Sequence, residues 1–174
     1  MLKTMITGHR PNKIGGYNKI TPLRAWVRKS ILDVLTELDK REPVTGMSGM
    51  ALGADQDFAE ACITRKLPFI AAIPFVGQES MWPPESQSWY QYLLGIAREK
   101  VIVCEGSYQA WKMQKRNQYM VDWCDVVIAV YDGTAGGTAN CVRYAQQHGK
   151  PIIVIDPVKR TITWPTQMDM FRKV

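Results

Sequence analysis

The chain has 174 residues, enough for one domain with a buried core and too few for two ordinary domains. Hydrophobic residues make up 46% and charged residues 22% of it, as in soluble proteins, and no apolar run approaches the roughly 20 residues that span a bilayer. The net charge of +6 indicates an anionic partner, either nucleic acid or a phosphorylated small molecule, and charge alone does not choose between the two.

Short runs rich in β-branched residues alternate with stretches of helical period, which is typical of βαβ units with a parallel sheet. We predict strands at residues 2–7, 43–47, 68–75, 100–105, 125–132 and 150–156, the second being short and weakly hydrophobic. Between them we predict helices at residues 21–40, 54–66, 89–100, 107–124 and 138–149. The pattern therefore predicts an α/β fold with a mostly parallel sheet, and residues 1–174 form a single domain.

Turn-forming residues set the expected boundaries. Thr21 is the expected N-cap of the first helix and Pro22 its first residue, whereas Gly149 is expected to end the last helix. Residues 76–89 are expected to be a loop, because Pro83 and Pro84 do not fit a helix interior. The tail, residues 157–174, is expected to pack on the surface or to add an edge strand.

The four cysteines form no C-x-x-C pair, and the two histidines lie far from them in the sequence. We therefore expect no metal site and reduced, buried thiols. The first residues lack the long apolar core and cleavage site of a secretory signal, so we expect the protein to reside in the cytoplasm and not to enter a membrane.

Three loops that follow predicted strands are unusually rich in glycine, at residues 7–17, 46–55 and 131–140. Such loops meet at the carboxyl edge of a parallel sheet, where ligands bind, and glycine lets the main chain approach a ligand. Helix N-termini after the second and third loops suit phosphate. The candidate ligand-binding residues in these loops are Thr7, Gly8, His9, Arg10, Gly49, Leu52, Gly53, Asp55, Asp132, Gly136, Gly137, Thr138 and Asn140, and the family resemblance described below adds Arg116 and Asn117.

Two of these side chains, Asp55 and Arg116, have two possible roles each. Asp55 either accepts hydrogen bonds from ribose hydroxyls or is an ordinary acid at a helix start. Arg116 either binds phosphate through two N–H groups or forms a surface salt bridge. No loop matches G-x-G-x-x-G or the Gly-Lys-Ser/Thr ending of a P-loop, which argues against hydride transfer and NTP hydrolysis.

Four stretches, "TGHRP", "GMALGADQ", "KRNQYMVDWCDVVIAVYDG" and "GGTANCVRYA", resemble the YpsA-like branch of the SLOG superfamily, which is related to DprA and to the LOG (Lonely Guy) nucleotide hydrolases. The resemblance runs from about residue 5 to residue 157. It implies a Rossmann-like open, mostly parallel sheet with helices on both faces and a pocket for nucleotides or nucleotide-derived ligands. No cofactor is certain, and the resemblance also implies that the chain can self-associate.

The resemblance to LOG enzymes bears on catalysis. Aligned on residues 125–130, Arg116 matches the arginine of the LOG signature, Asn117 replaces its lysine, and Gly137 with Thr138 matches its Gly-Thr. Cys141 then stands where the catalytic glutamate is expected. A buried thiol does not stabilise the positive charge that develops when an N-glycosidic bond breaks. Hydrolysis would need Asp55 or Asp132 to supply that charge beside Arg116, or Cys141 to act as a nucleophile with His9 as its base.

Three functions follow from these observations. The first is binding of a nucleotide-like ligand, such as an ADP-ribose-like, NAD-derived or signalling molecule, by a sensor, carrier or sequestering protein. The second is N-glycosidic hydrolysis or transfer on a nucleoside monophosphate. The third is binding of single-stranded DNA in the manner of DprA, which would use exposed aromatic side chains. Trp26, Trp111 and Trp123 are expected on core faces, and a loop with Met81, Trp82 and Tyr90 could form a lid over the site.

Overall fold

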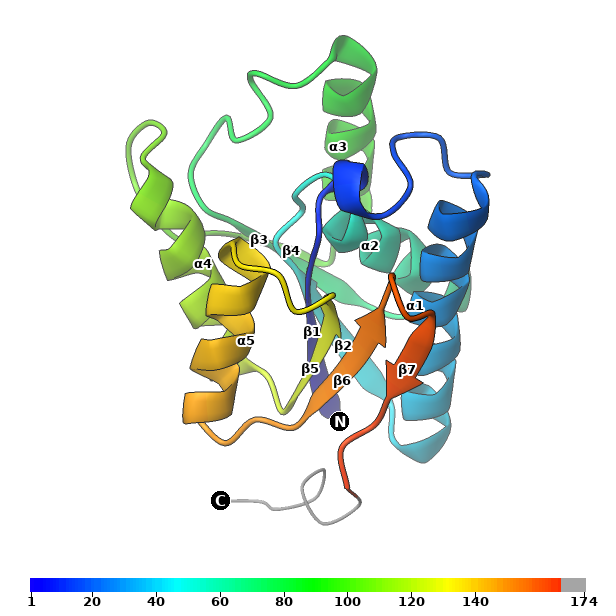
Figure 1. Ribbon diagram of the computed structural model, residues 1–174. Helices are drawn as coiled ribbons and strands as arrows, with labels where there is room; N and C mark the ends of the chain where they lie inside the picture. The colour runs from blue at the N-terminus through cyan, green and yellow to red at the C-terminus, as the bar shows by residue number, and fades with distance from the viewer. Residues whose placement is uncertain (167–174) are drawn as a thin grey trace.

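A computed structural model, which describes residues 1–166, has one seven-stranded sheet with the strand order β4-β3-β2-β1-β5-β6-β7 (Figure 1). Neighbouring strands are parallel, except that β7 runs antiparallel to β6. The strands are β1 (Leu2–Gly8), β2 (Val44–Ser48), β3 (Phe69–Ile73), β4 (Glu99–Ile102), β5 (Val126–Val130), β6 (Ile152–Asp156) and β7 (Thr161–Thr163). This arrangement confirms the predicted Rossmann-like α/β fold.

Helices cover both faces of the sheet (Figure 1). On one face, a core cluster contains Ile31, Phe58 and Leu93 from three different helices. On the other face, Met120 and Cys141 pack against inward-facing residues of the central strands. The helices are α1 (Pro22–Arg41), α2 (Ala54–Arg65) and α3 (Pro84–Ile96) on the first face, and α4 (Ala110–Trp123) and α5 (Gly137–Gln147) on the second; a short 3-10 helix, η1 (Pro11–Lys13), follows β1.

The order of the strands reverses at β1, which lies between β2 and β5. The register pairs Leu2 with Val44 on one side and Gly8 with Val130 on the other, so the loops after these strands leave the same edge. In open α/β sheets, ligands bind in the crevice that such a reversal creates. The fold therefore brings the β1–α1, β2–α2 and β5–α5 loops together at this reversal.

Prolines begin two helices. Pro22 is the first residue of α1, as predicted, because its missing N–H is not needed there. The prediction that residues 76–89 are all loop is wrong for its second half. Pro84 begins α3 and Pro83 is its N-cap, because proline is also tolerated at the start of a helix. Thr21 stands at the N-cap of α1, but its hydroxyl donates to the carbonyls of Gly15 and Asn18 and does not cap the helix.

Two further expectations change at the edges of the fold. The predicted strand 100–105 is shorter and lies at Glu99–Ile102, and the last helix begins at Gly137, inside the glycine loop. β7 forms an edge strand within the predicted tail, while residues 167–174 of that tail lie outside the described residues. Among the helices described, none is long and apolar enough to cross a membrane.

Candidate functional site

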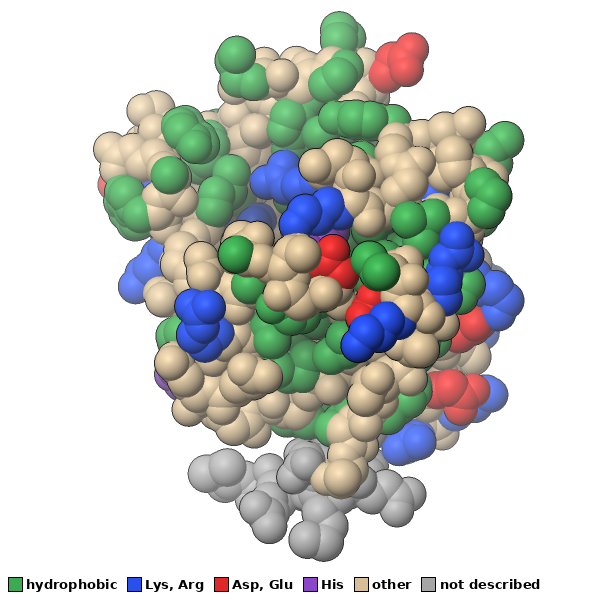
Figure 2. Space-filling model, viewed as in Figure 1, with side chains coloured by type: hydrophobic (Ala, Val, Ile, Leu, Met, Phe, Trp, Pro, Cys, Tyr) green, Lys and Arg blue, Asp and Glu red, His purple; other side chains and the backbone are tan. Residues whose placement is uncertain are grey.

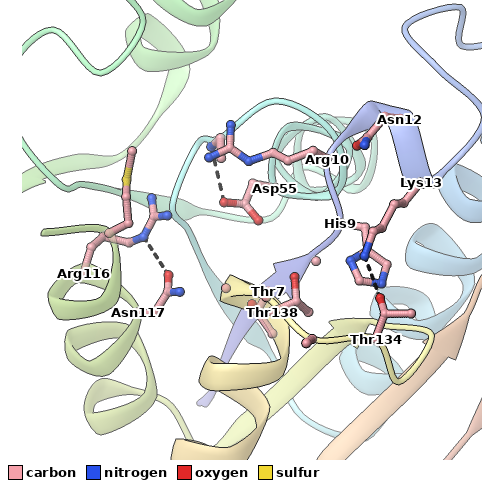
Figure 3. Close-up of a pocket in the computed structure, with 16 residues that line it drawn as sticks. Thr7, His9, Arg10, Asn12, Lys13, Asp55, Arg116, Asn117, Thr134 and Thr138 are labelled. Atoms are coloured by element: carbon pink, nitrogen blue, oxygen red, sulfur yellow. Dashed lines mark hydrogen bonds between the residues drawn. The ribbon is translucent and has the colours of Figure 1, made fainter. Parts of the chain in front are cut away.

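A cavity of about 340 Å³ opens at the carboxyl edge of the sheet, beside the strand-order reversal (Figure 3). Its wall comes from the β1–α1 loop, the start of α2, one face of α4 and the β5–α5 loop. The lining residues are Thr7, Gly8, His9, Arg10, Asn12, Lys13, Ala51, Asp55, Met113, Arg116, Asn117, Thr134, Ala135, Gly136, Gly137 and Thr138.

The structure brings most of the predicted site residues together at this cavity, including His9, Arg10, Asp55, Arg116 and Thr138. Five predicted residues do not line it, namely Gly49, Leu52, Gly53, Asp132 and Asn140. The prediction missed Asn12, Lys13, Ala51, Met113, Thr134 and Ala135. Met113 could have been found, because it lies one helical turn before Arg116 on the same face of α4.

Arg116 is the most unusual charged group of the cavity. Its side chain is only 4% exposed, yet among residues 1–166 no carboxylate lies within ion-pair distance of it. Its Nε donates to Asn117 Oδ1 at 2.9 Å and its Nη1 to the carbonyl of Gly49. Burial lowers the pKa of Arg116, and the nearby charge of Asp55 opposes this only in part. The alternative prediction that Arg116 forms a surface salt bridge is therefore wrong.

Gly49 contacts the guanidinium of Arg116 but does not line the cavity. A Cβ at this position would overlap the guanidinium of Arg116, so only glycine leaves room for it. The carbonyl of Gly49 also accepts a hydrogen bond from Gln78 Nε2 at 3.2 Å, which ties the β3–α3 loop to the same point. Gly49 thus positions Arg116 without lining the cavity.

The N-terminus of α5 offers free backbone donors. Its N-cap, Gly136, has a φ of 145° and no capping side chain, and the first turn holds no acid. The first helical hydrogen bond runs from the Asn140 N–H to the Gly136 carbonyl at 3.0 Å. The N–H groups of Gly137, Thr138 and Ala139 precede it and find no acceptor within the described part of the chain. Free N–H groups at a helix start suit an anion, and Gly137 and Thr138 line the same cavity as Arg116.

The sequence also predicted a phosphate-binding helix start at α2, but the N-terminus of α2 differs from that of α5. The N–H of Ala54 already donates to the carbonyl of His9 at 3.3 Å, and Gly53 has a φ of 98° where a Cβ would overlap that carbonyl. Asp55 and Asp57 make the first turn acidic. The protein itself therefore occupies the first amide of α2, whereas the start of α5 leaves its first three amides without an acceptor in the described structure.

Asp55 faces the cavity from the first turn of α2 (Figure 3). Its Oδ2 accepts a hydrogen bond from the N–H of Ala51 at 3.3 Å. Burial raises the pKa of Asp55, and the positive charges of Arg116 and Arg10 oppose the shift. A carboxylate in an otherwise cationic cavity suits a ligand that carries hydroxyl or amino donors as well as negative charge.

A chain of hydrogen bonds joins the first and third loops. His9 Nε2 lies 2.8 Å from Asp132 Oδ1, which also accepts from the Thr134 hydroxyl at 2.6 Å, and Lys13 Nζ donates to that hydroxyl at 2.6 Å. Burial raises the pKa of Asp132, but the hydrogen bonds from Thr134 and His9 outweigh it and hold the pKa well below its ordinary value. Asp132 therefore fastens the wall of the cavity rather than lining it.

Cys141 lies on α5, completely buried in the second core cluster. Burial raises the pKa of the Cys141 thiol to about 11, although Thr7 and Arg116 oppose the shift. The thiol is protonated at neutral pH and points away from solvent. It has the properties of neither a nucleophile nor the carboxylate that the LOG signature places here.

The aromatic side chains are only partly where they were predicted. Trp26 and Trp123 pack against the core clusters, as expected, but Trp111 is 56% exposed on α4. Tyr90 is buried and makes an edge contact with Trp82, with ring centroids 5.4 Å apart, so neither ring is free to act as a lid.

The sequence matches the model of the YpsA family, described as the YspA SLOG family, over residues 4–159. The chain belongs to this SLOG family. It is also 34% identical over 146 residues to the uncharacterized SPbeta prophage-derived protein YoqJ of Bacillus subtilis, a match that covers 72% of this chain and 84% of YoqJ.

Solved structures that resemble this SLOG chain share its fold. DprA from Helicobacter pylori, described for its single-stranded DNA binding mode, superposes with a TM-score of 0.63 at 22% identity, covering 88% of this chain. The chain spans only 64% of that DprA. The molybdenum cofactor carrier protein MCP of Chlamydomonas reinhardtii superposes with a TM-score of 0.54 at 14% identity, covering 88% of this chain and 75% of MCP.

Proposed function

We propose that the cavity binds a nucleotide or nucleotide-derived phosphorylated molecule and that the protein holds this ligand as a sensor, carrier or sequestering protein. The observation that carries the proposal is a buried, unpaired guanidinium beside the free amides of a helix start. An isolated buried charge is costly, and a bound anion would relieve that cost. A phosphate at Gly137 and Thr138 would accept from these amides and from Arg116 together.

The remaining walls suggest what the rest of the ligand is. Asp55 would accept hydrogen bonds from ribose hydroxyls, while Arg10 and Lys13 lie at positions that can attract further negative charge. The volume of about 340 Å³ is at the small end of the range of about 300–1,000 Å³ for ligand pockets. It favours a ligand of the size of one nucleotide, such as a signalling mononucleotide, over a complete dinucleotide.

Holding the ligand is favoured over cutting it. LOG-type hydrolysis needs a carboxylate at position 141, where this chain has a buried, protonated thiol. A structural neighbour is described as a cofactor carrier, which supports a fold that retains a small molecule. We expect no free base when the protein is incubated with nucleoside monophosphates and the mixture is separated by chromatography. Release of base that Asp55→Ala abolishes would instead establish the hydrolase function.

Calorimetric titration of the protein with a panel of mono- and dinucleotides tests the proposal. We expect micromolar binding of at least one phosphorylated member and none of the matching nucleosides. Arg10→Ala should weaken that binding, whereas Arg143→Ala, which removes an exposed arginine from α5 outside the cavity, should not. Absence of heat across the whole panel would contradict the proposed function.

Single-stranded DNA is the second candidate, and exposed aromatic residues favour it. Tyr108 and Trp111 are 65% and 56% exposed near the start of α4, the helix that also supplies Arg116 to the cavity. Bases stack on such rings, and neighbouring cations such as Lys115 contact phosphates. Oligonucleotide binding with a steep salt dependence that Trp111→Ala weakens would favour this candidate over a mononucleotide.

A further inference from the structure

His9 is a buried, ionisable side chain of the cavity that the proposed phosphate contacts do not use. It is only 5% exposed, and in Figure 3 it lies on the side of the cavity opposite Arg116. Its Nε2 lies 2.8 Å from Asp132 Oδ1, while its Nδ1 has no hydrogen-bond partner in the described structure. The protein thus fixes one ring nitrogen of His9 and leaves the other without a partner.

The contacts of His9 decide which nitrogen carries the proton when the ring is neutral. Two groups of Asp132 approach Nε2, the carboxylate oxygen at 2.8 Å and the backbone N–H at 3.2 Å. Burial raises the pKa of Asp132, but the hydrogen bonds from Thr134 and His9 hold it well below its ordinary value, so this side chain is charged at neutral pH and can only accept. Nε2 is therefore the donor in the shorter contact, and Nδ1 of a neutral His9 has a lone pair and no proton.

This fixed tautomer matters for an anion in the cavity. A neutral His9 offers the anion only the lone pair of Nδ1, which repels negatively charged oxygens, whereas a protonated ring offers an N–H donor and a positive charge. The carboxylate of Asp132 can stay bonded to Nε2 in both states, and it favours the charged ring. A bound anion and a proton on Nδ1 therefore stabilise each other.

Charged and titratable groups from each element around the cavity influence His9. They are Arg10 and Lys13 of the β1–α1 loop, Asp55 of α2, Arg116 of α4, Asp132 of the β5–α5 loop, and Tyr131, whose ring centroid lies 6.0 Å from that of His9. The cations among them oppose a further positive charge in the cavity. A dianion in the cavity offsets these cations, so it removes the main opposition to a proton on His9.

We propose that the cavity takes up one proton at Nδ1 of His9 when it binds a phosphorylated ligand, so that its affinity for dianions rises as the pH falls through the neutral range. This uptake rests on the proposed function, since it requires an anion at the start of α5. The proton comes from the solvent and returns to it when the ligand leaves. Because the two binding events are linked, a lower pH strengthens ligand binding by the same factor by which the ligand favours the protonated ring.

NMR titration of the full chain with sulfate at constant ionic strength tests this uptake, because sulfate remains a dianion from about pH 5 to pH 9, where histidine changes its charge. The side-chain signals of His9 should titrate at a higher pH with sulfate than without it. The ¹⁵N shifts of the neutral His9 ring should show the proton on Nε2. His148 is the internal control, since the chain has only two histidines and His148 is exposed at the far end of α5. Its titration should not move.

The affinity for sulfate should fall as the pH rises, by up to about tenfold per pH unit where one proton is taken up per anion. His9→Gln should remove this dependence, because glutamine does not titrate, and the matched control His148→Gln should keep it. Asp55 is a second source of pH dependence to exclude, because burial raises its pKa. A dependence that persists in His9→Gln and disappears in Asp55→Asn would assign the proton to Asp55 and overturn the proposal.

The amide signals of Gly137 and Thr138 in the same titration separate the proton uptake from the proposed function. If sulfate shifts these amides and leaves the titration of His9 unchanged, the anion site stands and the proton uptake is wrong. If sulfate shifts neither the amides nor the titration of His9, the anion site at the start of α5 fails and the uptake fails with it. The titration of the wild-type chain decides between these outcomes even if His9→Gln does not fold.

Discussion

The starts of α2 and α5 lie at the same sheet edge, both after a glycine with unusual backbone angles, yet they differ in chemistry. The start of α2 carries Asp55 and Asp57, and its first amide is bonded to His9. The start of α5 has no acid and leaves its first amides free beside Arg116. Glycine content alone therefore does not identify an anion site; what matters is whether the protein already occupies the donors.

The two acids in the first turn of α2 also differ in whether other groups of the protein already bind them. Asp55 faces the cavity, whereas Asp57 is completely buried and accepts from Arg24 Nε at 2.8 Å, Arg24 Nη2 at 2.9 Å and Arg28 Nη1 at 3.0 Å. One turn of helix thus provides both a carboxylate that faces the cavity and the centre of an ion-pair network that fixes α1 against α2.

The largest effect is expected from Asp57→Asn. It would leave the buried Arg24 without its anionic partner and lower the free energy of unfolding by about 3–5 kcal/mol. Urea denaturation measures the change. Asp33→Asn, which breaks an exposed pair with Lys29, is the control and should cost less than about 1 kcal/mol. Equal losses in the two variants would show that the network does not carry this stability.

Arg116→Met tests the start of α5. It removes charge-assisted hydrogen bonds worth about 1.5–3 kcal/mol each, so the affinity for the best-binding nucleotide of the panel should fall about 100-fold. The free energy of unfolding should not fall, because methionine replaces an unpaired buried charge by an apolar side chain of similar length. A large loss of stability with unchanged nucleotide affinity would mean that Arg116 has a structural role only.

Thr138→Asp makes the start of α5 resemble that of α2. An acid in the first turn stabilises a helix by about 0.3–1 kcal/mol, so the melting temperature should rise slightly. The same charge would repel a phosphate, and nucleotide affinity should fall about tenfold. Thr138→Asn keeps the size without the charge and should have the smaller effect on binding. Equal effects of the two variants would argue against an anion at this helix start.

Sequence alone predicted the sheet, because short apolar strands and amphipathic helices alternate along most of the chain. It also placed Gly137 at the site, because loops after parallel strands must share an edge, and the resemblance to the LOG signature placed Arg116 beside it. It did not show that the His9 carbonyl occupies the first amide of α2, since this contact depends on how β1 and β2 pair in space. Nor did it show that Trp111 is exposed, because the helical period predicts which residues share a face of α4 but not whether another element covers that face.

Asp55→Asn removes the acceptor that α2 directs into the cavity. If Asp55 reads ribose hydroxyls, the wild-type protein should bind a ribonucleotide several-fold more tightly than the matching 2′-deoxyribonucleotide, and the variant should bind both alike. Calorimetry of the two nucleotides with both proteins measures this. A wild-type protein without any preference would show that Asp55 does not contact the sugar.

Asp132→Asn tests the hydrogen bonds of Asp132 with His9 and Thr134, which join the β5–α5 loop to the end of β1. Because the pKa of Asp132 is lowered on folding, its charged form stabilises the fold above the unfolded pKa of about 3.9. That contribution is lost as the pH falls from there through the lower pKa of the folded protein. Urea denaturation between pH 6 and pH 2.5 should therefore show a shallower acid loss of stability in the variant than in the wild type. Identical acid slopes would mean that the hydrogen bonds from His9 and Thr134 do not stabilise the charge of Asp132, and the free amides of α5 would then lack the fixed wall that the anion site requires.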